Sequence, residues 1–314
     1  MNEALLGHFF APKAAFSPSP RLRRHNSTPP LTKEHIAHVL SQSRPSSAPG
    51  PDGIPYTTWK WVNAINPAIL LRLLSLLVSL GYHPPSLTVV NGVVLDKPGK
   101  PSYESPSSFR IIVLLCSVSK ILEWIIVAGL LLAARARALI HPNQCGSLPR
   151  LSTYDACLTL TNDVRALQRP RLKVSSLFLD IKAGCDNVDN PTLARILREG
   201  GIPDYLVYWV ASFLGERTCT LVHQGGPGTP ARVKVGALQG SSLSPLLLRI
   251  YVAPLHFRIP RGLILSYVND FALTATCPSY RGNIRRLQEL CRIIQGRAVR
   301  FSISFSILKT VLIH

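Results

Sequence analysis

The chain has 314 residues, and its 46% apolar residues are enough for a continuous core in one large domain or two smaller ones. Its 35 lysines and arginines exceed its 16 aspartates and glutamates, and the formal net charge of +19 favours a polyanionic partner, nucleic acid above all, over a basic protein whose arginines are merely solvated. Seven widely spread cysteines, without a Cys-x-x-Cys pair or a histidine beside them at zinc-ligand spacing, argue against a disulfide framework or a zinc site and indicate reduced thiols in an intracellular protein.

Residues 1–46 are predicted to form a flexible basic arm and linker. Residues 1–30 are rich in Pro, Ser and Arg and have too little apolar periodicity to pack. A short helix over 33–40 precedes the loop SQSRPSSAPGPDGIP, whose Pro-Gly and Asp-Gly steps favour turns. This arm has no basic-then-apolar signal pattern, so secretion is not implied. We expect the folded domain to occupy 47–314.

Helical and strand periodicities alternate after the arm. Residues 59–80 carry apolar side chains at helical spacing and predict one helix, and the alternating run TVVNGVVLDK predicts an edge hairpin. The most apolar run of the chain contains Lys120 and Glu123, so its uninterrupted part falls short of the roughly 20 residues of a membrane span. We therefore expect a buried helix over 119–134 and no membrane partner.

The second half of the chain continues the alternation. We expect helices over 153–167, 192–198, 205–214 and 281–294, a strand in VSSLFLDI, a hairpin of TCTLV with ARVKV, and two strands in LILSYVNDFALTAT that meet at a tight turn. This element order predicts an α+β fold in which helices back an antiparallel sheet.

Asp180 and Asp270 are the carboxylates best placed for chemistry. Asp180 ends an apolar strand, and Asn269-Asp270 lies at the turn between two apolar strands downstream. Nucleotidyl transfer needs carboxylates from separate strands that converge on two divalent cations, one for the attacking 3'-hydroxyl and one for the leaving pyrophosphate. Either aspartate alone is more simply a solvated surface group.

Six motifs follow one another along residues 47–314. They are SAPGPDGIP at Ser47, FRIIVLLCSVSKILEWII at Phe109, NQCGSLPRLSTYDA at Asn143, FLDIKAGCDNVD at Phe178, GALQGSSLSPLLLRIY at Gly236 and SYVNDFAL at Ser266. In this order they resemble the reverse transcriptase domain of a non-LTR, LINE-like retrotransposon. The resemblance implies the fingers and palm of a right-hand polymerase, with a central antiparallel sheet backed by helices and the thumb absent.

The resemblance also implies an activity and a set of site residues. The activity is that of an RNA-directed DNA polymerase that uses an RNA template, a DNA primer, dNTPs and two Mg²⁺ ions, with Mn²⁺ as an alternative. The implied residues are the metal ligands Asp180, Asp270 and the backbone of Ile181, the nucleotide contacts Lys97, Arg110, Cys185, Gln239 and Gly240, the catalytic hairpin with Tyr267 and Val268, and Lys309 of the last palm motif. Solvated surface charge is the alternative for Lys97 and Arg110, and hairpin packing is the alternative for Tyr267.

Several departures from the family pattern indicate a degenerate fragment. Asn269 stands where the Tyr-x-Asp-Asp hairpin has its first Asp, and a carboxamide offers one neutral oxygen in place of a charged ligand. Such a loss costs several kcal/mol of transition-state stabilisation, on the order of 10³-fold in rate. Cys185 replaces a bulky aromatic residue that screens the sugar 2'-position, and Leu238 and Ser242 replace prolines. We expect this copy to be impaired.

Two other functions stay open beside the impaired polymerase. A catalytically inactive nucleic-acid-binding remnant of a retroelement would share the fold, and Asn269 favours it for the isolated chain. A reverse transcriptase of the group II intron maturase type would share the catalytic logic, although the combination of motifs favours the LINE type. The Arg-rich arm is compatible with nuclear import, so we favour the nucleus over the cytoplasm.

Overall fold

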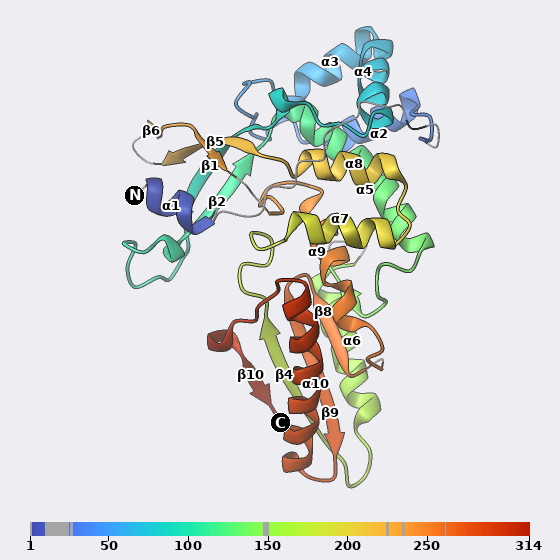
Figure 1. Cartoon of the computed structure of the whole chain (residues 1–314), viewed down its shortest axis with the longest axis vertical. Coiled ribbons are helices and arrows are strands. Elements are labelled where there is room, and N and C mark those ends of the chain that lie inside the picture. Colours follow the sequence, from blue (N-terminus) through green and yellow to red (C-terminus); the bar gives the residue numbers. More distant parts are fainter. Residues whose placement is uncertain are drawn as a thin grey trace. The chain divides into compact units, whose positions relative to one another are not determined.

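The computed structural model describes residues 2–9, 25, 28–146, 151–223, 226–233, 236–260 and 262–314. The chain folds into two compact units, each assembled from two stretches of sequence (Figure 1). Unit 1 consists of Met1–Arg137 and Asp189–Ser244, and unit 2 consists of Ala138–Val188 and Pro245–His314. The polymerase region that the sequence predicts from residue 47 onward is thus divided between two cores, and that domain boundary stays a prediction.

Unit 1 is a helical layer with a mixed sheet. Its helices are α1 (Asn2–Phe9), α2 (Lys33–Gln42), α3 (Tyr56–Ile65), α4 (Pro67–Ser79), α5 (Ser117–Ala136), α7 (Asn190–Glu199) and α8 (Asp204–Phe213), with short 3₁₀ turns η1 (Pro85–Leu87) and η2 (Pro106–Ser108). Its strands are β1 (Val89–Asp96), β2 (Phe109–Leu114), β5 (Arg217–His223), β6 (Gly226–Pro227) and β7 (Ala231–Val233). The strand order is β2-β1-β5-β6, with β7 also paired to β5, and all pairs are antiparallel except β1 with β5.

The single helix expected over 59–80 is wrong, because the structure has two helices there. α3 ends at Ile65 and α4 begins at Pro67, and their axes differ by 114°. Pro67 has no N–H to donate inside a helix, and the Asn66 side chain instead accepts a hydrogen bond from the Ala68 amide as the N-cap of α4. An Asn-Pro step is therefore a helix boundary in a run whose apolar periodicity looks continuous.

The run TVVNGVVLDK forms β1, which makes the expected hairpin with β2 but is not an edge strand. β1 lies between β2 and β5, and its parallel register with β5 pairs Val89 with Thr218 and Val93 with Val222. The contact is close at Gly92, where an added Cβ would lie 2.8 Å from Leu221 Cδ2. Alternation along one strand indicates a buried face but does not identify a second partner so far along the chain.

α5 is the apolar helix that the sequence predicts to be buried. Its 20 residues are long and apolar enough to cross a membrane by length and composition, and the bent pair of α3 and α4 passes the same test. However, 56% of the α5 window is buried in the structure, and Leu122, Ile126 and Leu130 are at most 1% exposed. α5 is therefore a core helix of this fold, and the expected absence of a membrane partner stays a prediction.

Two helices lie inside the expected N-terminal arm. α2 begins at a capping box in which the Thr32 side chain accepts a hydrogen bond from the His35 amide, and Ile36 and Leu40 are buried. Leu5 of α1 is only 1% exposed. The flexible part of the predicted arm falls mainly on residues 10–24, 26 and 27, which lie outside the described residues. Within the described ones, the arm contains packed helical segments.

Unit 2 is a sheet with helices on both faces. Its strands run in the order β10 (Val311–Ile313), β4 (Lys173–Asp180), β9 (Asp270–Cys277), β8 (Ile264–Tyr267) and β3 (Gln144–Cys145). All pairs are antiparallel except β3 with β8, so the expected antiparallel sheet is confirmed in its centre. The other elements are α6 (Thr153–Leu167), α9 (Ser244–Val252), whose first residue still belongs to unit 1, α10 (Tyr280–Arg300), η3 (Ala253–His256) and η4 (Ile307–Lys309).

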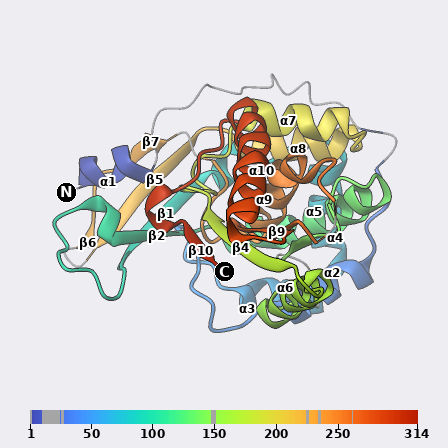
Figure 2. The same cartoon turned by 90° about the horizontal axis from the view of Figure 1, so that it is seen from below.

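α6 and α10 cover opposite faces of this sheet (Figure 2). Leu160 of α6 and Phe178 of β4 both pack against a buried cluster that includes Ala272 of β9. α10 instead meets the odd-numbered residues of β4, because Asn283 Nδ2 donates to Ser175 Oγ at 2.9 Å. Since successive strand residues point to opposite faces, the even-numbered Asp180 lies on the face of α6.

Candidate active site

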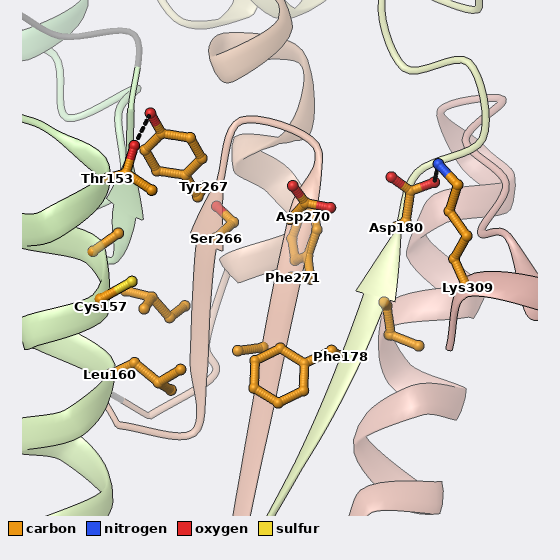
Figure 3. Close-up of a pocket in the computed structure, with 14 residues that line it drawn as sticks. Thr153, Cys157, Leu160, Phe178, Asp180, Ser266, Tyr267, Asp270, Phe271 and Lys309 are labelled. Carbon is orange, nitrogen blue, oxygen red and sulfur yellow. Dashed lines mark hydrogen bonds and ion pairs between the residues drawn. The ribbon is translucent and has the colours of Figure 1, made fainter. Parts of the chain in front are cut away.

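The sheet of unit 2 sets two carboxylates directly opposite one another. β4 and β9 pair over eight residues, and the last pair of this ladder is Asp180 with Asp270. Both side chains point to the same face at the same end of the sheet (Figure 3). Like charges directly opposite in an antiparallel pair destabilise a sheet, so this placement is costly unless a cation neutralises it. The sequence predicts that these two carboxylates converge from separate strands, and the register places them opposite one another.

The Asp180 carboxylate has a partner on each oxygen. Lys309 Nζ lies 3.0 Å from Oδ2, in an ion pair with Asp180, which is itself only 9% exposed (Figure 3). Asn269 Nδ2 donates to Oδ1 at 3.0 Å. The amide at position 269 therefore acts as a donor to the carboxylate that an aspartate there would repel.

The pKa of Asp270 is raised above its usual range. Partial burial is the largest cause, the charge of Asp180 adds to it, and the Lys309 ammonium opposes it. Asp180 and Asp270 therefore share more negative charge than the one lysine compensates. A bound proton or a bound cation would reduce the repulsion between these two carboxylates.

Backbone hydrogen bonds fasten the end of β4 to two neighbouring segments. The Ile181 amide donates to the Asn269 carbonyl at 3.0 Å, and the Ser306 amide donates to the Asp180 carbonyl at 2.8 Å. Ile181 also forms an isolated bridge with Phe305. The last stretch of the chain is thereby held beside β4, which is how Lys309 reaches Asp180.

The turn between β8 and β9 is held in an unusual backbone conformation. Val268 has φ +56°, a left-handed conformation that a β-branched residue rarely adopts. The Val268 amide donates to the Cys145 carbonyl at 3.3 Å, and the Tyr267 hydroxyl lies 3.1 Å from Thr153 Oγ1. A Cβ at Gly146 would lie 2.9 Å from Val268 Cγ2, so a glycine is needed where the neighbouring segment crosses the turn.

Arg249 is a buried residue that supports this turn and that the sequence did not single out. Its guanidinium donates to the carbonyls of Gln144 and Gly146, and Gln144 Nε2 donates back to the Arg249 carbonyl at 2.9 Å. The residue is 3% exposed. The segment that contacts the turn is therefore tied to α9. The only sequence signal for Arg249 was its place in the helix that follows the Gln-Gly motif.

A cavity of about 580 Å³ opens beside the two carboxylates, between α6 and the sheet (Figure 3). Its polar wall includes Asp180, Asp270 and Lys309, and its apolar wall includes Cys157, Leu160 and Phe178. All of these residues belong to unit 2. The cavity is large enough for a nucleoside-sized group next to charged oxygens.

Cys185 lies in the turn after β4 and is half-buried. Burial, with a smaller contribution from Asp186, raises the pKa of its thiol to about 11. The thiol is therefore neutral and unreactive at physiological pH. The turn passes close to the hairpin, because a Cβ at Gly184 would lie 3.3 Å from Asn269 Cβ.

The remaining predicted nucleotide contacts belong to unit 1. Lys97 follows β1, where its ammonium donates to the Ser107 carbonyl at 2.9 Å, and Arg110 is exposed on β2 opposite Leu95. The Val113 amide of β2 donates to the Gln239 carbonyl at 2.8 Å. The structure thus places Lys97 and Arg110 on the hairpin of β1 and β2, and it holds the backbone of Gln239 beside β2.

Gly240 has the backbone geometry that its motif suggests. Its φ is +112°, and an added Cβ would lie 2.6 Å from the Val113 carbonyl oxygen. Every other residue would therefore be strained by conformation and by contact. Gly240 thus lets the Gln-Gly turn pack closely on β2, and its contact with a nucleotide stays a prediction.

Glu123 of α5 fixes the segment that follows this turn. Its Oε2 accepts hydrogen bonds from Ser241 Oγ at 2.5 Å and from the Ser242 amide at 2.8 Å, and the side chain is completely buried. Burial raises the pKa of Glu123, whereas the hydrogen bonds and the buried Arg217 lower it. Glu123 belongs to the motif FRIIVLLCSVSKILEWII and interrupts the apolar run there, but its hydrogen-bond partners, 118 and 119 residues away, gave no local signal.

The family model for reverse transcriptase (RNA-dependent DNA polymerase) matches residues 95–314. The chain belongs to the reverse transcriptase family. Among its relatives are the probable RNA-directed DNA polymerases from transposon BS and from transposon X-element of Drosophila melanogaster, 25% and 27% identical over 90% and 87% of this chain. The RNA-directed DNA polymerase from mobile element jockey of Drosophila funebris is 25% identical over 88% of this chain. These matches confirm the predicted resemblance to non-LTR retrotransposons.

The reverse transcriptase chain spans about a third of these relatives' length, with 32%, 30% and 31% of each covered. A structure of apo telomerase from Candida tropicalis, truncated from its C-terminal domain, has a TM-score of 0.50 at 14% identity. The likeness covers 83% of this chain and 56% of the telomerase chain. At this identity it shows the fold alone, and it confirms the predicted α+β polymerase fold.

Reverse transcriptases generally use divalent metal ions, and the donor set of this site fits such an ion. Asp180 and Asp270 offer the charged oxygens that hard cations prefer. Burial and, after it, the charge of Asp180 raise the pKa of Asp270, and a bound cation would oppose both effects. Among the described residues, however, no group of three or more His, Cys, Asp and Glu side chains could hold a metal ion. Within the described part of the chain, Asp180 and Asp270 therefore form a pair of charged donors without a third such side chain in the group.

Proposed function

We propose that this chain supplies the fingers and palm of an RNA-directed DNA polymerase that extends a DNA primer on an RNA template. The observation that carries the proposal is the cross-strand pair of Asp180 and Asp270 at the mouth of the unit 2 cavity. Family membership supports template-primer and nucleotide as substrates. Two Mg²⁺ ions are the proposed cofactors, with Mn²⁺ as an alternative.

In this proposal the chain's own residues orient the reacting groups. Asp180 and Asp270, with the backbone of Ile181, would hold the metal ions, which supply the charge that activates a 3'-hydroxyl and neutralises pyrophosphate. Lys97 and Arg110 would bind the triphosphate, since one offers a compact ammonium and the other a planar guanidinium. Gln239 and Gly240 would contact the templating pair, and Cys185 would lie near the sugar.

Asn269 is proposed to impair this reaction in two ways. Its amide adds no negative charge to the site, and it donates a hydrogen bond to Asp180 Oδ1, an oxygen that a metal ion would otherwise take. Lys309 occupies the other oxygen of Asp180. Both contacts favour the second candidate function, a nucleic-acid-binding remnant without catalysis, as long as position 269 is an amide.

The experiment compares Mg²⁺-dependent dNTP incorporation on poly(rA)/oligo(dT) for the natural chain, Asn269→Asp and the control Asn187→Asp. Asn187 is half-buried in the turn after β4 and donates to the Lys182 carbonyl at 3.0 Å, so its substitution adds the same charge without entering the β8–β9 hairpin. We expect incorporation to rise on the order of 10³-fold in Asn269→Asp alone. Efficient incorporation by the natural chain would refute the impairment. If neither the natural chain nor Asn269→Asp incorporates dNTPs, the proposed polymerase function fails and the binding remnant remains.

A further inference from the structure

The outer face of α10 is a line of arginines on the side of the unit 2 sheet away from the carboxylates. α10 turns Leu287, Ile294 and Ala298 toward the sheet, where all three are buried. The opposite face carries four exposed arginines, spaced by four, seven and eight residues so that they share one side of the helix. We call Arg281, Arg285, Arg292 and Arg300 the α10 stripe.

The α10 stripe is not neutralised within its own helix. α10 contains six arginines and one acidic residue, Glu289. The two arginines outside the stripe have local partners, since Arg286 donates to the Thr276 carbonyl at 2.7 Å and Arg297 to the Leu255 carbonyl at 3.0 Å. Among the residues that the structure describes, the stripe arginines have no hydrogen bond or ion pair. Four guanidinium groups are therefore available to an external anion.

The basic surface continues past the first turn of α10. Lys173, at the start of β4, holds its ammonium 4.2 Å from the ring centroid of Tyr280, the first residue of the helix. Arg169 and Arg171 are exposed in the loop that leads to β4. From Arg281 to Arg300 the helix rises about 28 Å, which is the length of roughly eight base pairs of duplex.

We propose that the α10 stripe is a second nucleic-acid contact surface, which holds the phosphate backbone of a strand other than the one at the carboxylates. The sheet separates the two faces, because Asp180 lies on the α6 face and α10 covers the other (Figure 2). A duplex seated at Asp180 and Asp270 cannot reach the stripe without bending around the sheet. Arginine contacts to phosphate position a nucleic acid without reading its sequence, so the strand held there is bound without base specificity.

The chemistry of the helix favours nucleic acid over an anionic membrane surface. A helix that lies in a membrane interface inserts an apolar face into the lipid. The apolar face of α10 is packed on the sheet, and its partly exposed Ile284 and Ile293 lie in flanking grooves against Leu312 of β10 and Ala275 of β9. The stripe thus offers charge outward, and Val299 in the last turn, 73% exposed, is a single apolar side chain and not an apolar face.

The test is the salt dependence of binding to a fluorescent 20-base-pair RNA–DNA hybrid for three double variants. Arg285→Gln with Arg292→Gln removes two stripe charges, and Arg285→Lys with Arg292→Lys keeps them. The matched control, Arg195→Gln with Arg232→Gln, removes two exposed charges that already lie 3.4 Å and 3.9 Å from glutamates. Each phosphate contact contributes about 0.9 to the slope of log K against log[salt].

We expect the stripe Gln variant to lower that slope by about 2 and the affinity at 0.1 M salt by roughly 10- to 100-fold. The stripe Lys variant and the control should stay within about threefold of the natural chain. Equal losses in the stripe Gln variant and the control overturn the proposal. It is also overturned if the stripe Gln variant keeps its nucleic-acid slope but loses binding to phosphatidylserine vesicles, which would assign the surface to membranes.

The binding test does not depend on catalysis. If Asn269→Asp incorporates no dNTP while the stripe Gln variant has a lower slope of log K against log[salt], the polymerase function is refuted and the second surface is supported. If the chain polymerises while its stripe Gln variant binds like the control, the polymerase function is supported and the second surface is refuted.

Discussion

Replacing Asn269 by Asp should make the stability of unit 2 depend on divalent cations. In the natural chain the amide nitrogen of Asn269 lies 3.0 Å from Asp180 Oδ1 as a hydrogen-bond donor. In Asn269→Asp this contact becomes a pair of carboxylate oxygens at a similar distance, with Asp270 next along the chain and only Lys309 to compensate among the described residues. Three carboxylates then share one ammonium.

The size of the effect follows from the distance. Two unit charges 3.0 Å apart repel by about 5 kcal/mol at an effective dielectric constant of 20. Because position 269 is only half-buried and Lys309 still pairs with Asp180, solvent screening and partial protonation reduce this repulsion, and we expect a net destabilisation of about 1–3 kcal/mol without metal. A cation present at 100 times its dissociation constant would stabilise the folded state by about 2.7 kcal/mol.

Thermal unfolding followed by circular dichroism measures both the loss of stability without metal and the stabilisation by a bound cation. Without divalent cations, the Tm of Asn269→Asp should fall below that of the natural chain, by about 2–4 °C for each kcal/mol. Addition of 10 mM MgCl₂, on the order of 100 times a dissociation constant of about 0.1 mM, should restore it, while the natural chain and Asn187→Asp change little. An equal response to Mg²⁺ in all three proteins would refute the reasoning, as would a metal-free Asn269→Asp that is more stable than the natural chain.

Three further predictions concern single buried or paired charges. Lys309→Met should raise the pKa of Asp270 further, because Lys309 is the group that lowers it, and a carboxyl titration by NMR that leaves the Asp270 pKa unchanged would contradict this. Burial lowers the pKa of His256 to about 3 from 6.5, so its contribution to stability is present above pH 6.5 and is lost as pH falls toward 3. Across this pH window, the free energy of unfolding, measured with guanidinium, should depend on pH less steeply in His256→Gln than in the natural chain, by about 1.4 kcal/mol per pH unit, and equal slopes would contradict the prediction. Glu123→Ala should lower the free energy of unfolding by about 3 kcal/mol or more, because it leaves the Ser241 hydroxyl and the Ser242 amide without their acceptor. Glu123→Gln keeps an acceptor and should lower it by about 1 kcal/mol. Equal denaturation midpoints for the two variants would show that these hydrogen bonds do not stabilise the protein.

The carboxylate pair was predictable because each of its parts has a local signal. VSSLFLDI is β-branched and aromatic up to Asp180, and the structure has β4 end at that residue. The run before Asn269 and the run after it form β8 and β9, as expected for a tight turn. Helix α6 spans the predicted 153–167 because Ser152 and Asp155 form a capping box at its start.

Features that depend on distant partners were not predictable from one sequence. Glu123 looks like any charged residue in an apolar helix until Ser241 is folded against it. β1 alternates as an edge strand does, and only its pairing with β5 makes it interior. The division of the predicted polymerase region into two units also has no local signature, since each unit closes around contacts between segments far apart in the chain.

The parallel pairing of β1 with β5 has a consequence for the nascent chain. β1 ends at Asp96 and β5 begins at Arg217. At a synthesis rate of 5–20 residues per second, β5 leaves the ribosome about 6 to 24 s after β1. β2 follows β1 closely and covers one edge, but the other edge of β1 stays open throughout that interval. The yield of folded protein should therefore depend on chaperones that shield this strand during translation.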